Sequence, residues 1–111
     1  MTSGIFVATF SAGYTTIGEG IVVVKDGFVN GGDATYFYRG TFIDYGDDLK
    51  ATVEVKHYRG PLNSVLGPLK QYTLSLSGKR SGDDFELTGG IENMPGAKIT
   101  IRGTKIADLS G

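Results

Sequence analysis

The chain has 111 residues, a hydrophobic fraction of 40% and a formal net charge of −1 from 11 basic and 12 acidic residues. Proteins that bind DNA or RNA directly concentrate Lys and Arg on one face, so this balance argues against that class of function. The sequence has no Cys, which excludes disulfides, thiolate metal sites and a cysteine nucleophile.

The sequence predicts one domain over residues 1–111, because a chain of this length buries enough surface to fold without a disulfide or a structural metal. The first residues lack a basic stretch followed by an apolar run, so we expect no secretory signal. The longest strongly apolar run, residues 21–24, is too short to cross a bilayer. We therefore expect a cytoplasmic location and no membrane contact.

Apolar and polar side chains alternate along most of the chain, which is typical of antiparallel strands with one buried and one exposed face. Glycine is abundant, with 18 residues, and it suits both tight turns and the sharp coiling of a small closed sheet. The pattern predicts strands near residues 3–11, 17–25, 27–30, 34–43, 48–58, 70–78, 84–92 and 97–106.

Short strands with local connections predict an all-β fold, a single antiparallel up-and-down β-barrel of about eight strands. Closure is favoured because it leaves no exposed sheet edge, and a two-sheet sandwich is the alternative. Residues that tolerate positive φ mark the reversals. We expect a tight hairpin at Asp26-Gly27, a type II turn at Met94-Pro95-Gly96-Ala97, and reversals at residues 30–33, 44–48 and 81–83.

The segment from residue 60 to 69 breaks the alternation. It contains two prolines, and its apolar residues follow the spacing of one helical face: Leu62, Val65, Leu66 and Leu69. We expect one short helical turn near residues 61–67. The segment covers an open end of the barrel, either as a plug or as a lid over a ligand cavity.

The sequence offers few groups for catalysis. His57 is the only histidine and falls on the apolar side of its strand, which is typical of a hydrogen-bonded interior residue. A zinc site needs three or four nitrogen or sulfur ligands, and no serine stands in a nucleophile elbow. We therefore predict no catalytic residues, no metal and no cofactor, and a protein that is not an enzyme.

Three carboxylates cluster in the turn at residues 44–48. Because Asp is a favoured turn residue, the cluster is either ordinary turn chemistry or an acidic surface that a basic partner recognises. In the second case, the expected partner-binding residues are Asp44, Tyr45, Asp47 and Asp48.

Aromatic residues stand next to each other at positions 36–38, so their rings point to opposite faces of one strand. Apolar side chains on the outer face of a barrel are normally covered. We expect Phe37 and Ile43 to form a dimer interface with a second copy of the chain. The alternative is that residues 60–69 or the C-terminal tail cover them.

The inner face supports a second kind of function. If the barrel encloses a cavity, aromatic and apolar residues of the predicted strands line it, and an apolar small molecule is the expected ligand. The expected cavity residues are Tyr36, Tyr38, Phe42, His57, Tyr72 and Leu74.

Five motifs can be compared with known families. They are Gly4-Ile5-Phe6, Gly18-Glu19-Gly20-Ile21-Val22-Val23, the run Gly-Phe-Val-Asn-Gly-Gly-Asp at residues 27–33, Tyr36-x-Tyr38-x-Gly40, and Pro61-x-x-Ser64-Val65. In this order they resemble the GrlR-like family, named for a negative regulator of type III secretion gene expression. The similarity extends from about residue 4 to residue 106, and Gly-Gly-Asp followed by the spaced tyrosines is its most specific part.

This resemblance implies a lipocalin-like β-barrel, a homodimer and negative regulation of transcription. The family's founding member sequesters a helix-turn-helix transcriptional activator by direct contact, through a surface run of consecutive acidic residues. The matching turn here is residues 44–48, where Tyr45 and Gly46 interrupt the acidic run. The leading hypothesis is therefore a regulatory protein that binds an activator. The alternative is a carrier or sensor that binds a small molecule or lipid inside the barrel.

Overall fold

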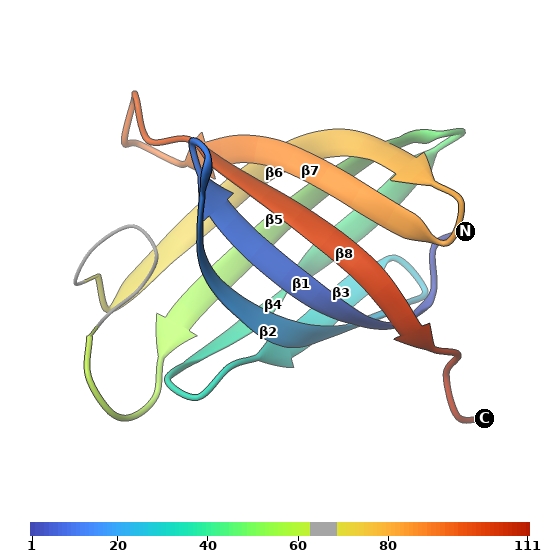
Figure 1. Ribbon diagram of the computed structural model, residues 1–111, viewed down its shortest axis with the longest axis horizontal. Helices are drawn as coiled ribbons and strands as arrows, with labels where there is room; N and C mark the ends of the chain where they lie inside the picture. The colour runs from blue at the N-terminus through green and yellow to red at the C-terminus, as the bar shows by residue number, and fades with distance from the viewer. Residues whose placement is uncertain (63–68) are drawn as a thin grey trace.

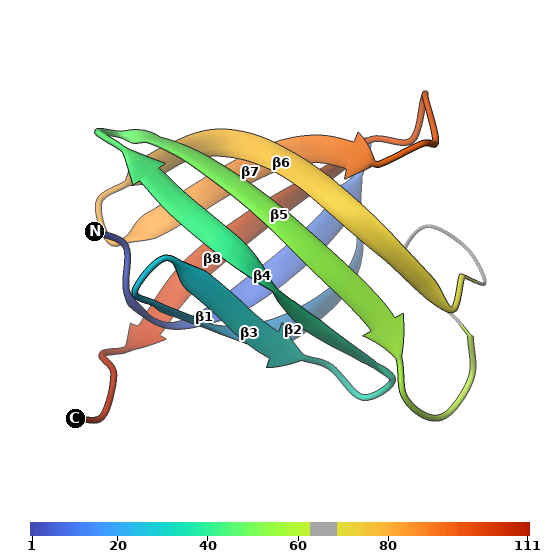
Figure 2. The same cartoon turned by 180° about the vertical axis from the view of Figure 1, so that it is seen from behind.

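The computed structural model describes residues 1–62 and 69–111, without the side chain of residue 17. Strands follow one another in chain order, each antiparallel to the next, and β1 pairs with β8 to close a barrel (Figures 1 and 2). The strands are β1 (Gly4–Ala12), β2 (Thr15–Lys25), β3 (Phe28–Gly32), β4 (Tyr36–Tyr45), β5 (Asp48–His57), β6 (Gln71–Ser81), β7 (Asp84–Ile91) and β8 (Ile99–Ala107).

The prediction of an antiparallel up-and-down barrel of eight strands is confirmed, and the sandwich alternative is wrong, because the sheet is continuous around the barrel. Two ends can be distinguished in Figure 1. The N-terminus and the β2–β3, β4–β5 and β6–β7 turns lie at one end. The β1–β2, β3–β4 and β7–β8 connections lie at the opposite end, together with the last residues of β5 and the first residues of β6. The helical turn expected near residues 61–67, with its plug or lid role, falls largely on residues 63–68, outside the described residues.

The chain reverses later than the sequence predicts, after residue 32 rather than at residues 30–33. Strand β3 continues through Gly31 and Gly32, and the chain turns at residues 33–35 instead. Gly31 lets β3 pack closely against β2, because a Cβ at this position would lie 2.0 Å from the carbonyl oxygen of Ile21 on β2. The local pattern is typical of a turn, whereas the contact with β2 requires the glycine inside the strand.

The other turns follow their expected chemistry. Asp26 and Gly27 have φ angles of 53° and 85°, as a type I′ hairpin turn requires. At the β7–β8 connection, the Ala97 N–H donates to the Met94 carbonyl at 3.4 Å, and Gly96 has a φ of 91°. This geometry is that of a type II turn.

The core is a set of inward side chains contributed by all eight strands, and within it the Phe85 ring contacts two other phenylalanines. The Phe85 ring lies 5.0 Å from the ring of Phe6 and 5.0 Å from that of Phe42, measured between centroids. Gly103 faces Phe85 across the β7–β8 pair, and a Cβ there would lie 2.2 Å from the ring. The glycine therefore makes room for the Phe85 ring.

We expect Phe85→Ala to lower the free energy of unfolding by about 3–5 kcal/mol, because it removes the ring that contacts both other phenylalanines. Urea denaturation measures the change. Tyr14→Ala is the matched control, since Tyr14 is fully exposed in the β1–β2 turn, and its effect should stay within about 0.5 kcal/mol. Equal effects of the two substitutions would contradict this packing.

Candidate functional site

The acidic turn, residues 44–48, is the end of a regular hairpin. Strands β4 and β5 stay paired up to Tyr45 and Asp48, which leaves Gly46 and Asp47 as the two turn residues. Gly46 adopts a φ of 66°, a conformation that glycine reaches without strain. The turn is thus held by a strand ladder rather than carried on a loose loop.

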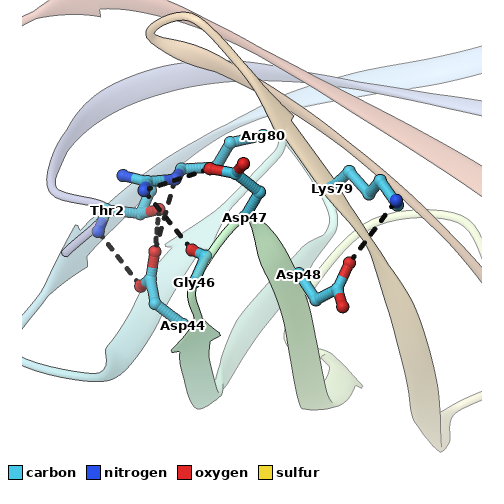
Figure 3. Close-up of polar contacts among 7 residues, drawn as sticks. All are labelled: Thr2, Asp44, Gly46, Asp47, Asp48, Lys79 and Arg80. Atoms are coloured by element: carbon cyan, nitrogen blue, oxygen red, sulfur yellow. Dashed lines mark hydrogen bonds and ion pairs between the residues drawn. The ribbon is translucent and has the colours of Figure 1, made fainter.

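The Asp44 carboxylate is hydrogen-bonded to another residue of the same chain. Its Oδ1 accepts a hydrogen bond from the Thr2 backbone N–H at 3.0 Å, and its Oδ2 accepts one from the Thr2 hydroxyl at 2.8 Å (Figure 3). The Nε of Arg80 lies 3.6 Å from Oδ2. Because the Asp44 side chain is only 12% exposed, it ties the N-terminal segment to the barrel and offers little surface to a partner.

Asp47 and Asp48 differ from Asp44 in exposure. The Asp47 side chain is 91% exposed and lies 4.0 Å from a terminal nitrogen of Arg80, which also donates to the Gly46 carbonyl at 3.4 Å. The Asp48 carboxylate pairs with Lys79 on β6 at 3.7 Å, a contact separate from the Arg80 cluster (Figure 3). The three carboxylates of the turn thus lie beside two cations, Arg80 and Lys79, which balance most of its negative charge.

Tyr45 completes the exposed part of the turn. Its side chain is 60% exposed although it is large and partly apolar. The residues available to a partner are therefore Tyr45, Asp47 and Asp48, and Asp44 belongs to the support beneath them.

The described part of the barrel interior contains a small cavity. Its volume is about 40 Å³, and it is lined by side chains from all eight strands, including Tyr38, Phe42 and Leu74 of the expected cavity residues. This volume exceeds that of one water-sized probe but is far below the roughly 150 Å³ of a cavity that accepts benzene. Its walls carry no polar surface, so it has nothing to orient a polar ligand.

The other three expected cavity residues lie together near the far end of the barrel. The ring of Tyr36 lies 5.3 Å from that of His57 and 6.5 Å from that of Tyr72, between centroids. The Tyr36 hydroxyl donates to the Leu69 carbonyl at 2.6 Å. His57 Nε2 lies 2.8 Å from the Gly60 carbonyl oxygen, which only accepts, so Nε2 carries the hydrogen. These bonds hold the two ends of the segment that joins β5 to β6.

The two residues expected at a dimer interface lie on the outer surface of β4. Phe37 is half-buried and packs against the Tyr58 ring at 6.4 Å between centroids. Ile43 is more exposed and lies beside the β2–β3 turn, because a Cβ on Gly27 would be 3.7 Å from its Cδ1. A neighbouring side chain of the same chain thus covers part of Phe37.

Asp33, the last residue of the Gly-Gly-Asp motif, has a structural role that the sequence does not predict. Its Oδ1 accepts hydrogen bonds from the backbone N–H groups of Thr35 and Tyr36 at 2.9 and 2.8 Å, and its Oδ2 accepts one from the Tyr38 hydroxyl. Burial raises the pKa of Tyr38 far above its ordinary value, and the bond to Asp33 raises it further. The phenol therefore stays neutral, and the pair braces the β3–β4 turn.

The motif Gly-Gly-Asp with spaced tyrosines is explained by these contacts. Gly31 meets the backbone of β2, Asp33 caps the turn, and Tyr38 returns to Asp33. Gly20 on β2 leaves room for the Tyr38 hydroxyl, which would lie 2.8 Å from a Cβ there. The part of the sequence that is most specific for the family resemblance thus serves folding. Thr2 and Arg80 were also missed, because their roles arise from contacts 42 and 36 residues away in the chain.

In comparisons with known proteins, the chain matches no family model and no curated protein. The resemblance to the GrlR-like family stays a prediction. Among residues 1–62 and 69–111, no three His, Asp or Glu side chains lie close enough to hold a metal ion. The same residues form no helix long and apolar enough to span a membrane.

We expect Asp44→Asn to lower the free energy of unfolding by about 1–3 kcal/mol, because the amide nitrogen would face a donor where a carboxylate oxygen now accepts. Asp48→Asn is the control and should change stability by less than about 0.5 kcal/mol, since its ion pair is exposed. Urea denaturation distinguishes them. If Thr2→Val alone leaves the free energy of unfolding unchanged, the Thr2 hydroxyl bond to Asp44 does not stabilise the fold and this explanation is wrong.

Proposed function

We propose that this protein is a non-enzymatic regulator that captures another protein through the exposed part of the acidic turn, Tyr45, Asp47 and Asp48. One observation carries the proposal: a large aromatic side chain stands 60% exposed at the end of a rigid hairpin, with exposed carboxylates after it. Exposed tyrosines are frequent anchors of protein interfaces, and they bind with little loss of side-chain entropy.

The charges suggest the chemistry of the partner. Asp47 is exposed beside Arg80, and Asp48 forms an exposed ion pair with Lys79, so an Arg or Lys of a partner can replace these contacts. Arg has the further advantage that its guanidinium stacks on the Tyr45 ring while it pairs with a carboxylate. A protein with a basic surface fits this turn.

The biological role follows from the family resemblance. We propose that the partner is a transcriptional activator with a helix-turn-helix domain, whose basic DNA-binding surface provides the required charge. Capture by the acidic turn would keep the activator from DNA and so lower transcription. A type III secretion system is the regulated target that the resemblance suggests.

Combining Tyr45→Ala with Asp47→Asn should abolish capture and leave stability within about 0.5 kcal/mol, because both side chains are exposed. We would identify the partner by affinity purification from the source cells, then measure the purified pair by calorimetry at several salt concentrations. The expected partner is a basic DNA-binding protein whose affinity falls as salt rises. The control combines Tyr14→Ala with Asp83→Asn, an exposed tyrosine and an exposed carboxylate on other turns. Equal affinities of the two double variants would refute this mechanism.

Small-molecule binding inside the barrel is the less well supported function, because the cavity that the described core side chains line has a volume of about 40 Å³. Native mass spectrometry of freshly purified protein tests it directly. We expect the mass of the bare chain, 11.8 kDa, or an integral multiple of it. A stoichiometric apolar adduct would favour a carrier or sensor instead.

A further inference from the structure

An open groove crosses the outer surface of strands β3 to β6, on the side of the barrel where β3, β4 and β5 face the viewer in Figure 2. Its volume is about 510 Å³, which is comparable with that of known ligand sites. The register places the outward side chains of these strands in two rows. One row is Phe28, Thr41, Thr52 and Ser75, and the other is Asn30, Arg39, Glu54 and Thr73. All of them except Ser75 line the groove.

Phe28 provides an apolar surface at one end of the two rows. Its side chain is 57% exposed, whereas the next residue, Val29, points inward and is buried. The face of an aromatic ring is electron-rich, so it attracts groups that carry a small positive charge, such as the C–H groups of a flat saturated ring. An exposed ring in a groove therefore favours a ligand with one flat C–H face.

The rest of the groove is lined by hydrogen-bonding groups of both kinds. Arg39 donates from Nε to the Glu54 Oε1 at 3.1 Å, and the two side chains are 66% and 31% exposed. A guanidinium only donates and a carboxylate only accepts, whereas the threonine hydroxyls and the Asn30 amide do both. A ligand hydroxyl can accept from Arg39 while it donates to Glu54. The groove thus matches a molecule with several hydroxyl groups.

The charges in and around the groove have both signs. Within it, the charges of Arg39 and Glu54 cancel. The charged residues that border the two rows are three cations, Lys25, Lys50 and Lys56, and two anions, Asp26 and Glu92. A site for nucleic acid or another polyanion concentrates cations on one surface. This groove instead has a carboxylate at its centre, which favours an uncharged ligand.

We propose that this groove binds a neutral oligosaccharide. A pyranose ring combines a flat C–H face, which fits Phe28, with hydroxyl groups at its edge, which fit the Arg39–Glu54 pair. The rows cross four strands and so extend about 14 Å, which suits a chain of sugars rather than a single one. The site is separate from partner capture, because Tyr45 and Asp47 are not among its residues.

An NMR titration of the isotope-labelled full chain tests the proposal. The probes are cellohexaose, laminarihexaose, maltohexaose and mannohexaose, each added to about 10 mM. We expect at least one of them to shift the amide signals of Arg39, Thr41 and Thr52, with a dissociation constant below about 1 mM. If no probe shifts these signals, the proposal is wrong.

Substitution of Phe28 tests the stacking on its ring. Phe28→Leu keeps an apolar side chain but removes the ring, so it should weaken binding about tenfold. Phe28→Tyr keeps the ring and is the matched control, with an affinity near that of the wild type. Circular dichroism and the thermal midpoint establish that both variants fold. Equal affinities of the two variants would overturn the role of the ring and with it the proposed sugar site.

A second set of variants tests that the ligand is uncharged. Arg39→Gln combined with Glu54→Gln keeps hydrogen-bonding amides, so it should bind more tightly than Arg39→Ala combined with Glu54→Ala. Neither added salt nor Lys56→Gln should weaken binding of the sugar. Loss of affinity in either case, or tighter binding of hexagalacturonate or poly(U) RNA, would overturn the proposal by assigning the groove to an anion. Partner capture should be unchanged in every variant of this groove, so either proposal can fail without the other.

Discussion

Backbone hydrogen bonding between β1 and β8 joins the first and last strands of the sheet, and the interior depends on this closure. Without it, both strands would be exposed edges, and the inward residues of β1 would face water. With it, alternate residues of every strand meet in one core. Three phenylalanines of the core, Phe6, Phe42 and Phe85, come from β1, β4 and β7, and the closed sheet brings them into contact through Phe85.

Polar anchors complete the two ends of the barrel. At the end that carries the N-terminus, Asp44 holds Thr2 and lies beside Arg80. Near the opposite end, Asp33 holds the β3–β4 turn and the Tyr38 hydroxyl. Both carboxylates are used within the fold, which limits what they offer to a partner. The exposed part of the acidic turn owes its rigidity to the same contacts, since Arg80 binds Asp44, Asp47 and the Gly46 carbonyl together.

The described interior and the acidic turn differ in what they expose. Inward side chains meet in an apolar core, which contains a cavity of about 40 Å³ among the described residues. At the outer end of the β4–β5 hairpin, in contrast, Tyr45 is 60% exposed and the Asp47 side chain is 91% exposed.

The sequence by itself determined the strand pattern, because side-chain alternation and turn residues are local features that depend on burial and on φ. It predicted eight antiparallel strands and an up-and-down barrel, and it located the type I′ and type II turns. Only the tertiary structure decided which polar groups are free. Asp44, Asp47 and Asp48 look equivalent in the sequence, but Asp44 meets Thr2 from 42 residues away and is buried by that contact. Likewise, Gly31 reads as a turn residue until β2 passes within contact distance. Such roles depend on distant segments, which no local pattern of residues encodes.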